Sequence, residues 1–251
     1  MKKGLILLSL ASGLVVSSVG ASGVSAEVVR KSSNVGIYAV VNPGGNVTAS
    51  FSKTMIKNAA TTWQVKETDK VYPVGTGMFF AEKVKSRGPW DYKHSYGTST
   101  KYVFGGKSMT GEGLGNLHYG YVGRFGGFSG NLLRSAAGAV QIYSGTALGK
   151  WYRTYFDDPN DQYYINLGIG YHDNKNIPTS AKSLLAPTVS NFAKNMTADQ
   201  DTDLEEILPN GMSEEQFLNI LTEEEKLAIA EEMERIEEIV KNDPELMSLV
   251  D

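Results

Sequence analysis

The stretch "SGNLLRSAAGAVQIYSG", residues 129–145, indicates the class of fold. Apolar and small side chains recur here at intervals of three and four residues, which places them on one face of an α-helix. The residues on this face are Leu132, Leu133, Ala136, Ala137, Val140 and Gln141. Because small side chains let a second helix approach closely, the stretch predicts a helix that packs against other helices.

Two further stretches on either side carry helix signals. "GTGMFFAEKVKS" (75–86) has a helical apolar pattern, and the following "RGP" ends it. "FDDPNDQYYINLGIGYHD" (156–173) predicts a helix that begins at Pro159, with acidic residues near the positive end of its dipole. We therefore expect a mainly α domain. An α+β fold is the alternative, because "VGIYAVV" (35–41) is a candidate strand in the N-terminal part.

The N-terminus has the pattern of an export signal. Lys2 and Lys3 precede the apolar run "GLILLSLASGLVV", and "VSA" ends at Ala26 with small residues suited to cleavage. The apolar run is shorter than the roughly 20 residues that a membrane span needs. We expect cleavage after Ala26, a secreted, extracellular protein, and no stable membrane anchor after cleavage. The sequence has no cysteine, which excludes thiolate nucleophiles and Cys-ligated zinc.

Charge divides the chain into two parts. Residues 27–200 carry 19 basic and 11 acidic residues, a net of +8, whereas residues 201–251 carry 17 acidic and 3 basic residues, a net of −14. A basic surface attracts polyanions such as nucleic acid, and it also attracts an acidic segment of its own chain. We expect the tail to bind the basic body in cis. It would act either as a polyanion mimic that limits activity or as a solvated helical appendage.

The acidic tail contains two helix starts. Ser213 with Gln216, and Thr222 with Glu225, have the spacing of capping boxes, so we expect a helical hairpin. The predicted organisation is a signal peptide (1–26), an irregular lead-in with minor strands (27–75), a central domain (76–195) and an acidic helical tail (196–251).

Three polar clusters in the central domain are candidates for chemistry. The first, "GPWDYKHSYG" (88–97), holds Asp91, Lys93 and His94 within four residues. A carboxylate beside a lysine and a histidine suits acid/base chemistry or phosphate binding. The alternative is a helix-terminating turn with solvated charges, in which Trp90 fills the core.

The second cluster is "GNLHYGYVGRFGGFSG" (115–130). If this stretch is extended, Asn116 and His118 lie on the same side and share one space. Its glycines would let a ligand approach the backbone. The alternative is that His118 is a structural residue.

The third cluster is "DDPNDQ" (157–162). Asp157, Asp158 and Asp161 could bind a divalent metal or supply a base, because hard cations prefer oxygen ligands. They could equally cap a helix N-terminus.

The three clusters and the helix between them, taken in order, resemble the bacterial polymorphic toxin type 44 domain over about residues 76–172. The resemblance implies an exported toxin of interbacterial competition, predicted to be a ribonuclease, with an immunity protein as a partner. The positions that match the motifs are Trp90, Asp91, Lys93, Asn116, His118, Tyr119, Gly120, Gly138, Gln141, Asp157, Asp158, Pro159, Asp161 and Gln162. The chain departs from the pattern at Leu117, where an aromatic residue is expected, and at Phe156, where glycine is common.

These candidates give a specific hypothesis for RNA cleavage. His118 with one of Asp91, Asp158 or Asp161 would serve as acid and base, and Lys93 would be the cation near the phosphate. The substrate would contact a second set: Trp90, Asn116, Tyr119, Gln141 and Gln162. No cofactor is predicted; a divalent metal, if used, would bind Asp157, Asp158 and Asp161. The competing hypothesis is a non-enzymatic exported protein that binds a polyanion or a cell-surface partner, so enzymatic activity stays open.

Overall fold

The computed structural model describes residues 44–143, 158–180 and 208–250. The elements in chain order are α1 (Thr48–Thr68), α2 (Val74–Val84), α3 (Tyr92–Tyr96), β1 (Lys101–Phe104), β2 (Lys107–Thr110), α4 (Gly111–Phe125), α5 (Gly130–Tyr143), α6 (Pro159–Asp173), the 3-10 helix η3 (Pro209–Gly211), α8 (Glu214–Leu218), α9 (Glu223–Asn242) and α10 (Pro244–Met247). The fold is mainly α, as predicted, with one small antiparallel hairpin formed by β1 and β2. None of the helices in the described ranges is long and apolar enough to cross a membrane.

The part of the predicted lead-in that the structure describes is mostly helical, in line with a modest helical pattern in "SKTMIKNAAT" (52–61). Residues 48–68 form α1, a helix of 21 residues whose buried side chains include Phe51, Met55, Ala59 and Trp63. Threonines and lysines separate these apolar positions, so the periodic signal in the sequence is weak. The predicted strand at 35–41 lies outside the described residues.

Helix α4 crosses α6 with almost no space between the two backbones. A Cβ atom on Gly120 would lie 2.1 Å from the carbonyl oxygen of Ile165, and one on Gly168 would lie 2.1 Å from that of Leu117. Because the distance between helices is set by the side chains at their contact, this crossing requires glycine on both helices. Gly120 belongs to the stretch whose glycines we expected to let a ligand approach the backbone. It instead lets helix α6 approach.

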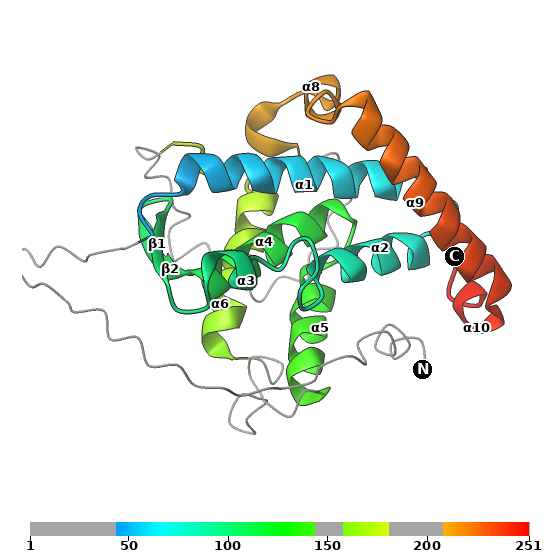
Figure 1. Cartoon of the computed structure of the whole chain (residues 1–251), viewed down its shortest axis with the longest axis horizontal. Helices are drawn as coiled ribbons and strands as arrows, with labels where there is room; N and C mark the ends of the chain where they lie inside the picture. The colour runs from blue at the N-terminus through cyan, green and yellow to red at the C-terminus, as the bar shows by residue number, and fades with distance from the viewer. Residues whose placement is uncertain (1–43, 144–157, 181–207, 251) are drawn as a thin grey trace, which may run out of the picture.

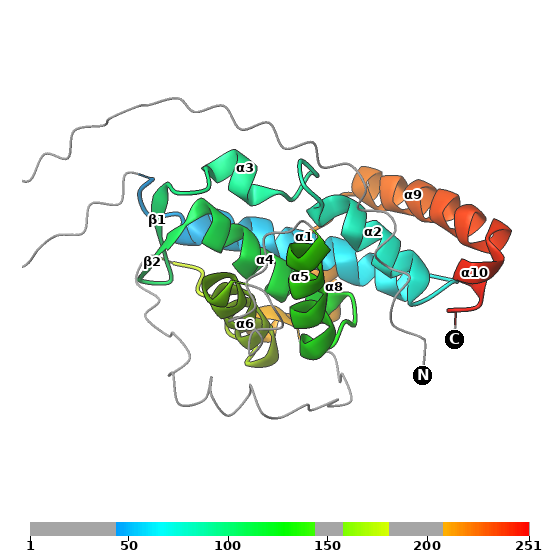
Figure 2. The same ribbon diagram turned by 90° about the horizontal axis from the view of Figure 1, so that it is seen from below.

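The hairpin and helix α9 lie at opposite ends of α1 (Figures 1 and 2). At the N-terminal end, the amide of Val47 donates to the carbonyl of Val103, 2.9 Å away, and Thr48 Oγ1 accepts from the amide of Gly105. Helix α4 packs between α1 and α6. The two ends of α1 thus anchor different parts of the chain.

The tail forms helices at both predicted starts, but α8 and α9 do not pack side by side as the predicted hairpin would. Both capping boxes are present: Ser213 and Thr222 each accept from the backbone of their partner three residues later. Phe217 on α8 is fully buried, with its ring centroid 6.2 Å from that of Trp63 and 5.3 Å from that of Phe125. The tail helices therefore share the hydrophobic core of the body.

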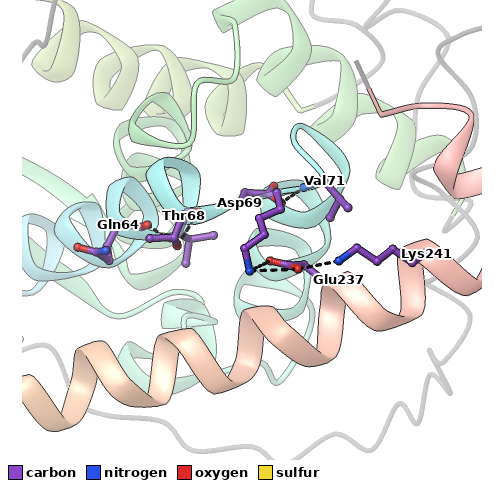
Figure 3. Close-up of polar contacts among 8 residues, drawn as sticks. Gln64, Thr68, Asp69, Val71, Glu237 and Lys241 are labelled. Atoms are coloured by element: carbon purple, nitrogen blue, oxygen red, sulfur yellow. Dashed lines mark hydrogen bonds and ion pairs between the residues drawn. The ribbon is translucent and has the colours of Figure 1, made fainter.

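Three ion pairs join α9 to lysines of the body. Lys57 pairs with Glu225 at 2.5 Å, Lys83 with Glu232 at 2.7 Å, and Lys70 with Glu237 at 3.3 Å. Figure 3 shows Glu237 beside the loop that follows α1, with Lys241 on its other side. Burial raises the pKa of Glu237, but hydrogen bonds from Lys241 and Lys70 outweigh it, so this pKa lies below its ordinary value.

Candidate functional site

The stretch "GNLHYG" (115–120) lies within helix α4, so the extended conformation considered for it is wrong. Two residues along an α-helix are separated by about 200°, so neighbouring motif positions point in different directions. The Asn116 side chain reaches α6, that of His118 reaches α1 and α3, and the Tyr119 hydroxyl donates to the Leu133 carbonyl on α5 at 3.1 Å. Helix α4 is therefore the element on which the motif segments meet.

Asn116 joins the second and third clusters. Its Nδ2 donates to Oδ1 of Asp161 at 2.7 Å, and both side chains are half-buried. A hydrogen bond from a side-chain amide fixes the orientation of a carboxylate. The contact thus holds a carboxylate in place between α4 and α6.

The first cluster contributes Lys93 to the same region. The backbone amide nitrogen of Lys93 lies 3.5 Å from the position that a Cβ of Gly115 would occupy, so α3 lies against α4 one residue before Asn116. The Lys93 side chain is exposed. The structure therefore joins Asn116 to Asp161 and places the backbone of Lys93 beside Gly115, the neighbour of Asn116 on α4.

Glu112, which the sequence analysis did not select, lies on the Asn116 face of α4. It precedes Asn116 by four residues, which places the two on the same face of α4, and it is half-buried. That spacing is visible in the sequence once α4 is known to be helical. We call Lys93, Glu112, Asn116 and Asp161 the Asn116 cluster.

His118 occupies a buried aromatic site on a different side of α4. It is 0 % exposed, and its ring centroid lies 4.7 Å from that of Tyr92 and 5.5 Å from that of Trp90. Its Nε2 lies 2.9 Å from Nδ2 of Asn58, which also donates to the Tyr92 hydroxyl at 2.8 Å. Asn58 belongs to α1, a helix whose packing on α4 the sequence does not reveal.

Burial lowers the pKa of His118 to about 3, so its imidazole is neutral at neutral pH. In the part of the chain that the structure describes, Nδ1 has no hydrogen-bond partner. No hydrogen bond or ion pair there joins His118 to Asp91, Asp158 or Asp161. The helical geometry directs His118 away from Asp161, whereas Asp91 lies between Trp90 and Tyr92, whose rings contact His118, without a hydrogen bond to it.

Asp91 and Asp158 make local backbone contacts. Asp91 is buried and accepts from the amide of Arg87 at 2.7 Å in the turn after α2. Asp158 is the N-cap of α6 and accepts from the amide of Asn160 at 2.8 Å. Among the described residues no three His, Asp or Glu side chains are placed to hold a metal ion, and Asp157 lies outside those residues.

The remaining predicted contacts lie in the core or on α5. Trp90 packs edge-on against Phe79 and Phe80. Gln162 is buried, and its Nε2 donates to the carbonyl of Arg134 on α5 at 3.1 Å. Gln141 belongs to α5, but its side chain lies outside the described part of the structure.

Arg134 is a buried cation that sequence reasoning missed. Its Nη1 donates to Oδ1 of Asn166 at 3.3 Å, and the side chain is 8 % exposed. In the described ranges it forms no ion pair with a carboxylate. In the sequence it is one polar residue inside a helical pattern, which gives no sign that it becomes buried.

The fold and the Asn116 cluster define the class: a mainly helical domain in which short polar motifs from α3, α4 and α6 meet. Residues 79–174 match the family model of Bacterial toxin 44. This confirms the resemblance. No significant match to the chain was found among curated proteins or among solved structures. Helix α1 and the tail lie outside the matched residues.

Proposed function

We propose that the chain is an exported toxin that cleaves RNA, with the Asn116 cluster as the reacting site. The observation that carries the proposal is the 2.7 Å hydrogen bond from Asn116 to Asp161, which joins two motif segments of the toxin domain close to Lys93. The half-buried position of both side chains leaves the pair in reach of a substrate.

The residues of the cluster suit phosphodiester cleavage without a metal ion. Asp161 takes the proton of the 2′-hydroxyl as that oxygen attacks the phosphorus. Lys93 stabilises the negative charge that develops on the phosphate oxygens. The departing 5′-oxygen takes a proton from solvent. The products are a 2′,3′-cyclic phosphate and a free 5′-hydroxyl.

His118 has a positioning role in this proposal. Its ring contacts Tyr92, the first residue of α3, and Trp90, which lies just before that helix. Its contact with Asn58 ties this group to α1. A neutral, buried imidazole is suited to holding α3 against α4. The position of Lys93 over Gly115 depends on that contact.

Charge supports a polyanionic substrate. The net charge of +8 on residues 27–200 attracts RNA over long distances. Helix α9 contacts α1 and α2 and pairs with three of the body's lysines, and none of its ion pairs involves the Asn116 cluster. We therefore assign the tail a structural role rather than that of a polyanion mimic. A toxin of this kind also implies an immunity protein in the producing cell.

The test compares two aspartates of α6 that differ in their surroundings. The chain from Glu27 onward is incubated with a labelled RNA oligonucleotide, and cleavage is followed on denaturing gels. We expect Asp161→Asn to lower the cleavage rate roughly 100-fold or more, the scale of losing a catalytic base. This substitution keeps an oxygen that can accept from Asn116.

Asp158→Asn is the matched control, because asparagine caps a helix about as well as aspartate. It should cleave RNA at nearly the wild-type rate. If Asp161→Asn cleaves RNA as fast as the wild type, the Asn116 cluster is not part of the mechanism. Binding of RNA by the wild type without any cleavage would favour the non-enzymatic alternative, in which the basic body binds a polyanion.

A further inference from the structure

Helix α6 carries an exposed aromatic side chain close to the Asn116 cluster. Tyr163 is 41 % exposed, and its ring centroid lies 5.2 Å from that of Tyr164 with the ring planes at 76°. Tyr164 is half-buried and fixed against α4, since a Cβ on Gly113 would lie 2.8 Å from its ring. The exposed ring is therefore supported by a second ring that is itself held by the core.

A lysine from the β-hairpin lies beside the exposed ring. Lys107 Nζ donates to the Tyr163 hydroxyl at 3.0 Å and lies 5.7 Å from the ring centroid. Lys107 pairs with Phe104 in the hairpin register, and Phe104 is fully buried. A positive charge and an aromatic face are thus presented together on rigid elements.

This pair adjoins the proposed reacting site through Tyr164. Asp161 precedes Tyr164 by three residues, on the same face of α6, whereas the Tyr163 side chain points to another side of the helix and is linked to that face by its contact with the Tyr164 ring. The pKa of Tyr164 is raised by burial first, and also by the charge of Asp161, so the carboxylate acts on the neighbouring ring. A chain bound at Tyr163 would therefore reach the Asn116 cluster by way of the Tyr164 ring.

We propose that Tyr163 and Lys107 form a subsite in which one base of single-stranded RNA stacks on the tyrosine ring while the lysine contacts an adjacent phosphate. The proposal rests on the proposed function, because it names the form of RNA that reaches the Asn116 cluster. Every base has a face that can stack on an aromatic ring, so the subsite accepts unpaired bases without sequence preference. Paired bases in a duplex do not offer this face.

The test measures binding separately from cleavage. Fluorescence anisotropy is recorded with a single-stranded 2′-deoxy oligonucleotide, which lacks the attacking hydroxyl, and with the same oligonucleotide in which the bases are replaced by abasic sites. We expect Tyr163→Ala to bind the normal oligonucleotide about 5- to 100-fold more weakly, the scale of losing one stacked base. Tyr163→Phe should bind nearly as well as wild type, and the abasic oligonucleotide should bind all three proteins equally weakly.

Leu227→Ala is the control, because Leu227 is 61 % exposed but lies on α9 at the opposite end of the molecule from the hairpin (Figure 1). Equal binding by Tyr163→Ala and wild type overturns the subsite, as does failure of the wild type to bind any oligonucleotide. A parallel incubation with the ribose form reports on cleavage. Base-dependent binding without cleavage there would sink the nuclease proposal and leave the subsite standing.

Discussion

The α4–α6 crossing and the contact of α9 with α1 and α2 stabilise the molecule in different ways. At the crossing, Gly120 and Gly168 let two backbones meet, and an added methyl group at either position would collide with a carbonyl oxygen. At α9 the contact is made by long side chains: aliphatic residues face the body and glutamates pair with lysines. The first contact leaves no room for side-chain adjustment, whereas the second can adapt by rotamer changes.

This difference largely follows the boundary of the residues that match the toxin family model. The crossing lies inside residues 79–174, whereas the tail and α1 lie outside them; α2 spans the boundary, and its Lys83, the partner of Glu232, lies inside. The match therefore covers the part in which backbone geometry fixes the positions of Asn116 and Asp161. The surrounding helices bury its apolar faces, and one of them, α1, supplies Asn58 to His118.

The largest effect is expected from the apolar centre of the tail contact. Phe217→Ala removes a fully buried ring between Trp63 and Phe125, and such a change costs about 3–5 kcal/mol in the free energy of unfolding. Urea denaturation followed by circular dichroism measures it. Leu218→Ala, at the next position of α8 but only partly buried, should cost clearly less. A loss below about 1 kcal/mol for Phe217→Ala would mean that the tail is an independent appendage.

Elements whose signals are local could be predicted from the sequence. The helix start at Pro159 with its Asp158 cap, and both capping boxes of the tail, depend on residues within one turn of each other. Helix α4 could not be predicted in this way, because five of its 15 residues are glycine, the poorest helix former after proline. Its helical form depends on packing against α6, which no local pattern encodes.

The candidate site shows the same limit. Asn116 and Asp161 were selected by residue type, but the hydrogen bond between them joins positions 45 residues apart. An extended α4 would have placed His118 beside Asn116. The helix separates them instead, so the site lost its histidine and gained Glu112 from the preceding turn.

An intermediate effect is expected at the crossing, where two glycines of α4 can be compared. Gly120→Ala forces a methyl group onto the Ile165 carbonyl and should destabilise the protein by about 1–3 kcal/mol, the usual cost of overpacking. Gly115→Ala meets its nearest atom at 3.5 Å, an ordinary contact, and should stabilise α4 by up to about 1 kcal/mol through helix propensity. Urea midpoints of the two variants measure the difference. Equal midpoints would contradict the close approach of α4 and α6.

The smallest effect is expected from a single ion pair of α9. Glu232 contacts Lys83 at 2.9 and 2.7 Å through its two oxygens, and their side chains are 26 % and 20 % exposed. Pairs in contact with solvent contribute about 0–1 kcal/mol, so Glu232→Gln should lower the free energy of unfolding by no more than that. A double-mutant cycle with Lys83→Met isolates the pair, and its coupling should shrink in 1 M salt because the charges are screened. Glu231→Gln, an exposed neighbour on α9, is the matched control. A coupling well above 1 kcal/mol that persists in salt would mean that charge, rather than the apolar face around Met233, holds the tail in place.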